Sequence, residues 1–178
     1  ISYKGFHILL RAIGWLKPKY PNIQLRIAGH VKGRYMQSGY TKYLESLIRD
    51  LDLVENVVFL GSLNEYQIVK ELQNVDVTVI PSFVETYCLA FAESMIIGTP
   101  TIASYAGAMP ELAEDGKDAF FYNSMDFISC AYYIDQLVCD KSLAEKLSAN
   151  GRKRRLQEND RELVVNTQLD IYHKIIES

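Results

Sequence analysis

Hydrophobic residues recur along this chain with two different periods, one typical of helices and one typical of strands. Near the start, apolar side chains three and four positions apart predict a helix over residues 5–17. In the next segment, apolar and polar residues alternate, which predicts a strand over residues 23–28. The two patterns continue to alternate as far as residue 122. They predict strands at 56–60, 75–80, 101–103 and 119–122, separated by helices at 39–51, 65–73 and 110–114 and by a short apolar helix before residue 101.

This alternation indicates an α/β fold: a Rossmann-like parallel sheet with helices on both faces. From residue 124 onward the pattern is helical throughout, which adds a C-terminal helical tail with helices at 125–138, 142–156 and 160–176. A chain of 178 residues has the size of one domain, so we interpret residues 1–178 as a single domain. Because the first predicted element is a helix, we expect a strand to precede Ile1 in a longer polypeptide.

Two helices carry polar residues that predict where they begin. Asn64 followed by Gln67 predicts a capping box for the helix at 65–73, and Ser142 followed by Glu145 predicts one for the helix at 142–156. Pro110 stands where a first helical residue is expected.

Composition narrows the classes of protein that fit this chain. A formal net charge of −3 argues against general nucleic-acid binding, and the sequence has neither a long apolar run nor a signal peptide at its start. The three cysteines show no CxxC spacing, and the histidines are scattered, so we expect neither a disulfide framework nor a metal site. These features favour a cytoplasmic location, with the inner face of the membrane as an alternative.

The stretch from Pro81 to Ser104 is the most informative part of the sequence. Glu85 lies in the loop before a helix, and Glu93 lies eight positions later within that helix. In open α/β sheets, ligands bind where strands end, and a helix N-terminus there favours an anion. An anion site with carboxylates nearby suggests a nucleotide-sugar, in which a diphosphate is flanked by hydroxyl groups.

Each glutamate also has a simpler interpretation. Glu93 could be an ordinary solvated helix residue, but its apolar neighbours favour a buried carboxylate that pairs with ribose hydroxyls. Glu85 could compensate the helix dipole, whereas a loop carboxylate at a strand end is also a candidate for a binding site.

In order and spacing, several pieces of the chain resemble the GT-B glycosyltransferases of family 4, the glycosyl transferases group 1. The stretch PSFVETYCLAFAESMIIGTPTIAS resembles that family's donor-site signature, in which two glutamates are separated by seven residues. Five further pieces resemble the family's motifs: Lys4-Gly5, Ile27-Ala28-Gly29, Val57 to Gly61, Val75-Asp76-Val77 and Gly107 to Glu111. The resemblance covers nearly the whole chain and corresponds to the C-terminal, donor-binding half of the family's architecture.

The resemblance implies a retaining glycosyltransferase that uses a nucleotide-diphosphate-sugar donor and needs no metal or other cofactor. It implies catalytic roles for Glu85, against the donor sugar, and for Lys4, against the diphosphate. The donor-binding residues that it implies are Glu93, Gly29, Leu63, Thr86, Tyr87, Cys88 and Leu89. The implied partners are an N-terminal GT-B domain that is absent here and an acceptor, which is a sugar, a polysaccharide or a lipid-linked glycan.

Three features leave alternatives open. The family usually has glycine where this chain has Thr86 and Cys88, which supports a second interpretation: a non-catalytic module that binds nucleotides or sugar phosphates. The basic run 152–155 fits a solvated helix face, with peripheral membrane association as the alternative. In the last helix, apolar residues form a stripe that needs a partner, so we expect it to be exposed or to pack on another chain: Val165, Leu169, Tyr172 and Ile176.

Overall fold

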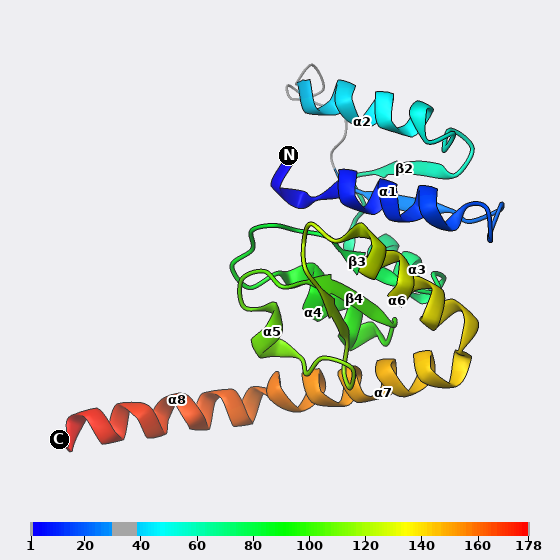
Figure 1. The fold of residues 1–178 in the computed structure, drawn as a ribbon. Coiled ribbons are helices and arrows are strands. Elements are labelled where there is room, and N and C mark those ends of the chain that lie inside the picture. Colours follow the sequence, from blue (N-terminus) through cyan, green and yellow to red (C-terminus); the bar gives the residue numbers. More distant parts are fainter. Residues whose placement is uncertain (1, 30–38, 178) are drawn as a thin grey trace.

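The computed structural model describes residues 2–29 and 39–177, and Figure 1 shows its elements in chain order. The helices are η1 (Ser2–Lys4), α1 (Phe6–Leu16), α2 (Gly39–Asp50), α3 (Glu65–Gln73), α4 (Leu89–Ile97), α5 (Met109–Leu112), α6 (Phe127–Cys139), α7 (Lys141–Glu158) and α8 (Arg161–Ile176). The strands are β1 (Leu25–Ala28), β2 (Val57–Gly61), β3 (Thr78–Ile80), β4 (Thr101–Ser104) and β5 (Phe120–Tyr122). The predicted α/β fold with parallel strands and helices on both faces is confirmed.

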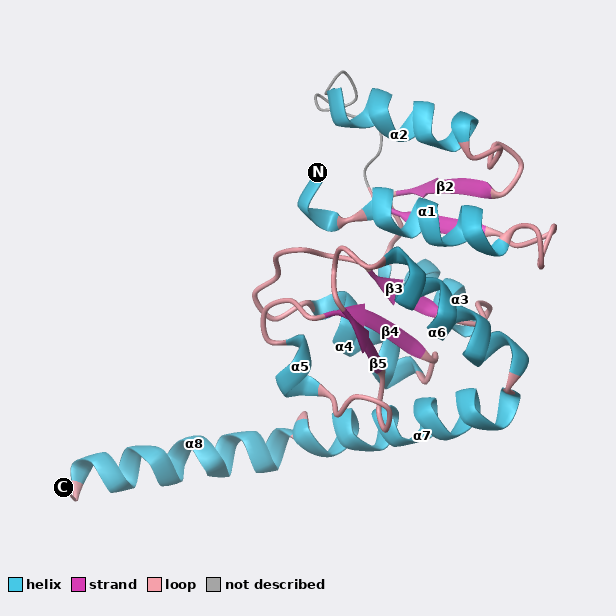
Figure 2. Cartoon of the chain, in the orientation of Figure 1, coloured by secondary structure: helices cyan, strands magenta, loops and turns pink. Residues whose placement is uncertain are grey.

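The strands form two parallel sheets rather than the single sheet that we predicted. One sheet has the order β1-β2 and the other has the order β3-β4-β5. Leu25 pairs with Val57 in the first sheet, and Thr78 pairs with Thr101 in the second. Within residues 2–29 and 39–177, no strand pairing joins β1 to β3, and Figure 2 shows the two sheets as separate groups of arrows.

Alternate residues of the larger sheet pack against different helices. Ile102 and Tyr122 belong to a core that includes α1 and α6, whereas the neighbouring Ala103 and Phe121 belong to a second core formed with α4 and α5. All four residues of β4 are buried, as expected for a strand covered on both faces. This arrangement places the start of α4 at one edge of the sheet, where β3 and β4 end.

Some predicted boundaries and caps differ from those observed. Residues 75–77 lie outside β3 because only Thr78–Ile80 pair with β4. The capping box of Asn64 and Gln67 is confirmed, with both hydrogen bonds at 2.9 Å. The one predicted at Ser142 is wrong, because α7 begins earlier and Asp140 accepts the Leu143 N–H at 2.9 Å. The predicted loop 29–37 falls almost entirely outside the described residues.

The helix α8 extends away from the rest of the molecule, as Figure 1 shows in red. Every residue of this helix is exposed, including the predicted apolar stripe, in which Ile176 is 80% exposed. The expectation that the stripe would lie uncovered is confirmed.

Among the described residues, no helix is both long enough and apolar enough to cross a membrane.

Candidate functional site

The loop that carries Glu85 is held in place from two directions by backbone hydrogen bonds. This loop, residues 81–88, connects β3 to α4. On one side, the Phe83 N–H donates to the Tyr3 carbonyl at 2.7 Å; on the other, the Ala108 N–H donates to the Thr86 carbonyl at 2.9 Å. Three segments far apart in sequence, residues 2–5, 81–88 and 105–109, therefore meet at this position.

Two glycines allow these segments to approach so closely. Gly5 has φ 69° and Gly107 has φ 55°, both in the left-handed region that favours glycine. A Cβ atom on Gly5 would lie 1.7 Å from the Pro81 carbonyl oxygen, and one on Gly107 would lie 2.2 Å from the Glu85 carbonyl oxygen. The loop is therefore clamped between two positions that accept no side chain.

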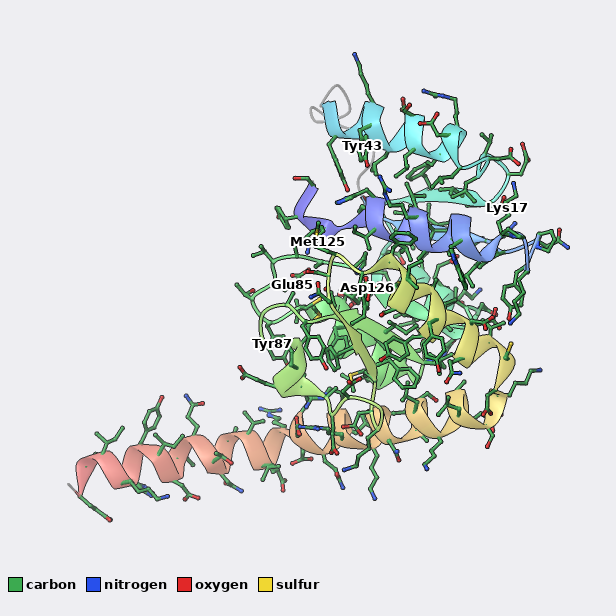
Figure 3. The ribbon with its side chains drawn as sticks, viewed as in Figure 1. Lys17, Tyr43, Glu85, Tyr87, Met125 and Asp126 are labelled. Carbon is green, nitrogen blue, oxygen red and sulfur yellow. The ribbon has the colours of Figure 1, made fainter. Side chains whose placement is uncertain are left out.

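Lys4 and Glu85, predicted as catalytic residues, lie in direct contact. The Lys4 Nζ donates to Glu85 Oε1 at 2.6 Å, and the Ser82 hydroxyl donates to the same oxygen at 2.7 Å. The Glu85 side chain is only 11% exposed, whereas the Lys4 side chain is 39% exposed. In Figure 3, Glu85 and Tyr87 lie on one side of the molecule and Lys17 on the other.

The surroundings of Glu85 keep its carboxylate ionised. Burial alone would raise the pKa of Glu85, but hydrogen bonds from Lys4 and Ser82 and the Lys4 charge outweigh that effect and lower it. The site therefore presents a fixed negative charge whose cationic partner remains partly open to solvent. Ser82 was not among the predicted site residues. It stands three positions before Glu85, a spacing visible in the sequence that allows a serine hydroxyl to reach the carboxylate.

The turn from Thr86 to Leu89 leads into α4. Thr86 and Tyr87 are exposed, and Leu89 is 69% exposed. Cys88 is buried and caps α4 with φ 64° and ψ 78°, and no side chain caps the helix. The first N–H groups of α4 therefore have no capping side chain, which leaves them able to bind an anion.

Cys88 adopts a backbone conformation that disfavours branched side chains, which leads to a stability prediction. Cys88→Val should lower the free energy of unfolding by about 2 kcal/mol, because a β-branched residue at positive φ is strained. Cys88→Gly should change it by less than about 1 kcal/mol, since relief of strain offsets the lost packing and the added chain entropy. Urea unfolding measures both. The control is Cys139→Val, at an exposed helical cysteine; equal losses at the two positions would contradict the prediction.

Glu93 is exposed, so the expectation that it would be buried is wrong. It lies one turn after Leu89, on the side of α4 that faces solvent together with Ala90. The buried polar residue of this helix is instead the next one: the Ser94 hydroxyl donates to the Phe91 carbonyl at 2.8 Å and lies 2.9 Å from the Thr101 hydroxyl. Among the described residues, the Glu93 side chain has no hydrogen bond or ion pair. Its predicted donor-binding role is neither supported nor contradicted by this exposure.

Gly29 and Leu63 lie where the two strands of the smaller sheet end. Gly29 directly follows β1, and its N–H donates to the Gly61 carbonyl at 2.8 Å. Leu63 is partly buried and precedes the Asn64 cap of α3. Gly29 therefore lies at a carboxyl edge, and Leu63 follows the end of β2 by two residues. Their predicted donor-binding roles stay predictions.

The basic run 152–155 is only partly a solvated helix face. Arg152 and Lys153 are exposed, whereas Arg154 donates to Asp118 at 2.9 Å. Arg155 is 1% exposed, which corrects the interpretation of the whole run as solvated. Its burial follows from the tight packing of α7 against α4.

The comparisons with known proteins agree on one family. The family model described as glycosyl transferases group 1 matches residues 1–154. The chain is 30% identical over 150 residues to an uncharacterized glycosyltransferase of Methanocaldococcus jannaschii, covering 84% of this chain and 36% of that protein. The chain thus spans about a third of the length of this curated relative.

Solved structures with the same fold include two glycosyltransferase structures. HepE of Anabaena in complex with UDP-glucose matches 100% of this chain and 46% of its own, with TM-score 0.84 and 24% identity. The C-terminal domain of a glycosyl transferase group 1 family protein from Francisella tularensis matches 89% of this chain and 80% of its own, with TM-score 0.78 and 24% identity. At these identities the similarity establishes the fold.

Proposed function

Because this chain belongs to the glycosyl transferases group 1 family, we propose that it is the donor-binding domain of a retaining glycosyltransferase. In this function a sugar passes from a nucleotide diphosphate donor to an acceptor sugar, polysaccharide or lipid-linked glycan. The observation that carries the proposal is the Lys4–Glu85 pair, 2.6 Å apart beside the uncapped start of α4. Cation, carboxylate and helix N-terminus are the groups that a sugar diphosphate requires.

The proposed roles follow from the charge of each group. Lys4 carries three N–H donors, so it can keep one hydrogen bond to Glu85 while donating others to a phosphate oxygen. Negative charge grows on the departing diphosphate, and both Lys4 and the N–H groups of Cys88 and Leu89 stabilise it. Glu85 holds a hydroxyl of the donor sugar and stabilises positive charge at the anomeric carbon. The reaction needs no metal in this scheme, which stays a prediction.

Glu93, Gly29 and Leu63 complete the proposed donor site. The exposed carboxylate of Glu93 accepts hydrogen bonds from the two ribose hydroxyls, and Gly29 and Leu63, which follow β1 and β2, bind beside the base. UDP is the first nucleotide to test, because HepE of Anabaena was solved with UDP-glucose.

Calorimetric titration of the chain with UDP, GDP and ADP tests the proposal. We expect one of them to bind, and Glu93→Ala to weaken that binding about tenfold, because a charge-assisted hydrogen bond to the ribose is lost. The matched control is Glu145→Ala, at another exposed helical glutamate, on α7; its affinity should equal that of the original chain.

The possible results of the titration distinguish the donor-site assignment from the ribose role of Glu93. No binding of any of the three nucleotides would contradict the donor-site assignment. Binding that Glu93→Ala leaves unchanged would remove the ribose role alone. Tight nucleotide binding without sugar transfer by the complete protein would favour the alternative, a non-catalytic nucleotide or sugar-phosphate binding module, for which the side chains at Thr86 and Cys88 are the supporting feature.

A further inference from the structure

The division between the two sheets is bordered by two strand edges with unpaired backbone groups. In β1, the Leu25 N–H donates at 2.7 Å to the carbonyl of the residue before β2, and in β3, the Thr78 N–H donates at 2.9 Å to the carbonyl of the residue before β4. Backbone groups of successive strand residues point to opposite sides, so those of Arg26 and Val79 point away from these partners. Within residues 2–29 and 39–177, no strand pairs with either of these edges (Figure 2). Such an edge can accept a further strand.

Both edges belong to one layer of the molecule, because a single core packs against the two sheets. This core includes Leu25 of β1, Ile102 of β4 and buried residues along α1. The first turn of α1 also touches both halves. The His7 Nδ1 lies 3.0 Å from the Tyr40 hydroxyl of α2, the helix that follows β1, and the His7 ring stacks on Phe83, which follows β3, with ring centroids 5.5 Å apart. The helix α1 therefore begins at the carboxyl ends of both edge strands.

The segment that leads into α1 already pairs with the chain at the end of β3. The Phe83 N–H donates to the Tyr3 carbonyl at 2.7 Å. Phe83 stands an even number of positions after Val79, a spacing that places both N–H groups on the same side of an extended chain. A strand that ended at Tyr3 would continue this pairing back along the free edge of β3.

We propose that the division is a slot for one parallel strand, filled by the segment of the polypeptide that leads into Ser2. This strand pairs with β1 at Arg26 and with β3 at Val79, and it joins the two sheets into one. Together with α1 and β1 it forms the crossover unit that connects parallel strands. Because the segment is covalently linked to Ser2, it reaches the slot at a far higher effective concentration than a separate chain does.

The resulting strand order gives the slot a role at the donor site, and this role rests on the function proposed above. The order becomes β2, β1, the added strand, β3, β4 and β5, and it reverses between the added strand and β3. Ligands bind at such a switch point, beyond the carboxyl ends of the two strands. Lys4 follows the added strand and Glu85 follows β3, so their 2.6 Å contact spans the switch point. The added strand therefore holds the segment that carries Lys4.

Amide hydrogen exchange tests the slot by comparing the chain of 178 residues with the same chain lengthened by the residues that precede it in its polypeptide. An addition of about eight residues is enough for one strand. In the chain of 178 residues, the amides of Arg26 and Val79 should exchange faster than the hydrogen-bonded amides of Leu25 and Thr78. In the longer chain, exchange at Arg26 and Val79 should slow about fivefold or more, the value of one hydrogen bond.

The matched control is the longer chain with two alternate residues of the added segment changed to proline, which cannot donate to a strand ladder. This control should exchange as the chain of 178 residues does. Should the longer chain fail to fold, the added residues supplied as a separate synthetic peptide decide by the same comparison of exchange rates.

Several results would overturn the proposal. Equal protection of the four amides in the unextended chain would show that its edges are already paired. Slower exchange at only one edge, or at neither, would show that the added segment does not fill the slot. If the unextended chain sedimented as a dimer with Arg26 and Val79 protected, a second copy would be the occupant. Because exchange needs no nucleotide, a chain that bound no UDP would contradict the proposed function alone.

Discussion

Gly5→Ala is expected to lower the free energy of unfolding by about 3 kcal/mol or more, from positive-φ strain of roughly 1–2 kcal/mol and overpacking of roughly 1–3 kcal/mol. The added methyl group would lie 1.7 Å from the Pro81 carbonyl oxygen, where backbone rather than a flexible side chain must move. A loss of this size is a large part of the ~5–15 kcal/mol by which domains are stable. Urea unfolding followed by circular dichroism measures it.

The control for this prediction is Gly39→Ala, at the first residue of α2. A Cβ atom there would meet nothing within 4 Å, and the residue has no positive φ. Alanine should be neutral or stabilise the fold by up to about 1 kcal/mol, since alanine has a higher helix propensity than glycine. If both variants unfolded at the same denaturant concentration, the close approach of Gly5 to Pro81 would be refuted.

Lys4→Ala is expected to lower the kcat/KM of the proposed glycosyltransferase by about 10²–10³-fold, the usual effect of removing one charge-stabilising group from a reacting centre. The change removes a cation from the diphosphate site. It also leaves the Glu85 carboxylate, which is 11% exposed, without its cationic partner, although the Ser82 hydroxyl still donates to it. The uncompensated negative charge would then repel the donor, so KM should rise while kcat falls.

Lys17→Ala is the matched control, because Lys17 also forms an ion pair, with Asp52 at 2.8 Å. That pair lies at the surface, on the opposite side of the molecule from Glu85 in Figure 3. Exposed ion pairs contribute little, so we expect less than about a twofold change in kcat/KM. Steady-state kinetics with the donor varied compare the two variants, and equal losses would show that Lys4 has no special role.

The parts of the site that depend on order along the chain could be predicted from sequence. Lys4 stands before a helix and Glu85 after a strand, and parallel topology brings both to one edge of the fold. Local signals were equally informative where the interaction spans few residues, as for the Asn64–Gln67 capping box. In these cases the partner is either adjacent in sequence or set by the alternation of strands and helices.

Features that depend on three-dimensional packing could not be predicted. The apolar composition of α4 suggested a buried Glu93, yet Leu89 on the same side of the helix is exposed. Hydrophobic composition alone does not show which side of a helix faces solvent. Arg155 was hidden in a basic run, and only the approach of α7 to α4 distinguishes it from its neighbours. The division into two sheets likewise depends on backbone hydrogen bonds between strands, which periodicity does not reveal.

The two separate sheets have a consequence for how the two halves of the fold are held together. Hydrogen bonds hold β1 to β2 and β3 to β4 and β5, but the described strands have no such bonds across the division. The halves are joined by the core shared by α1 and α6, by the Phe83–Tyr3 backbone hydrogen bond and by the Lys4–Glu85 ion pair. Because no described strand pairing crosses the division, these contacts hold the two sheets together. Since Lys4 precedes α1 and Glu85 follows β3, the ion pair joins elements of the two halves and reports whether they are docked.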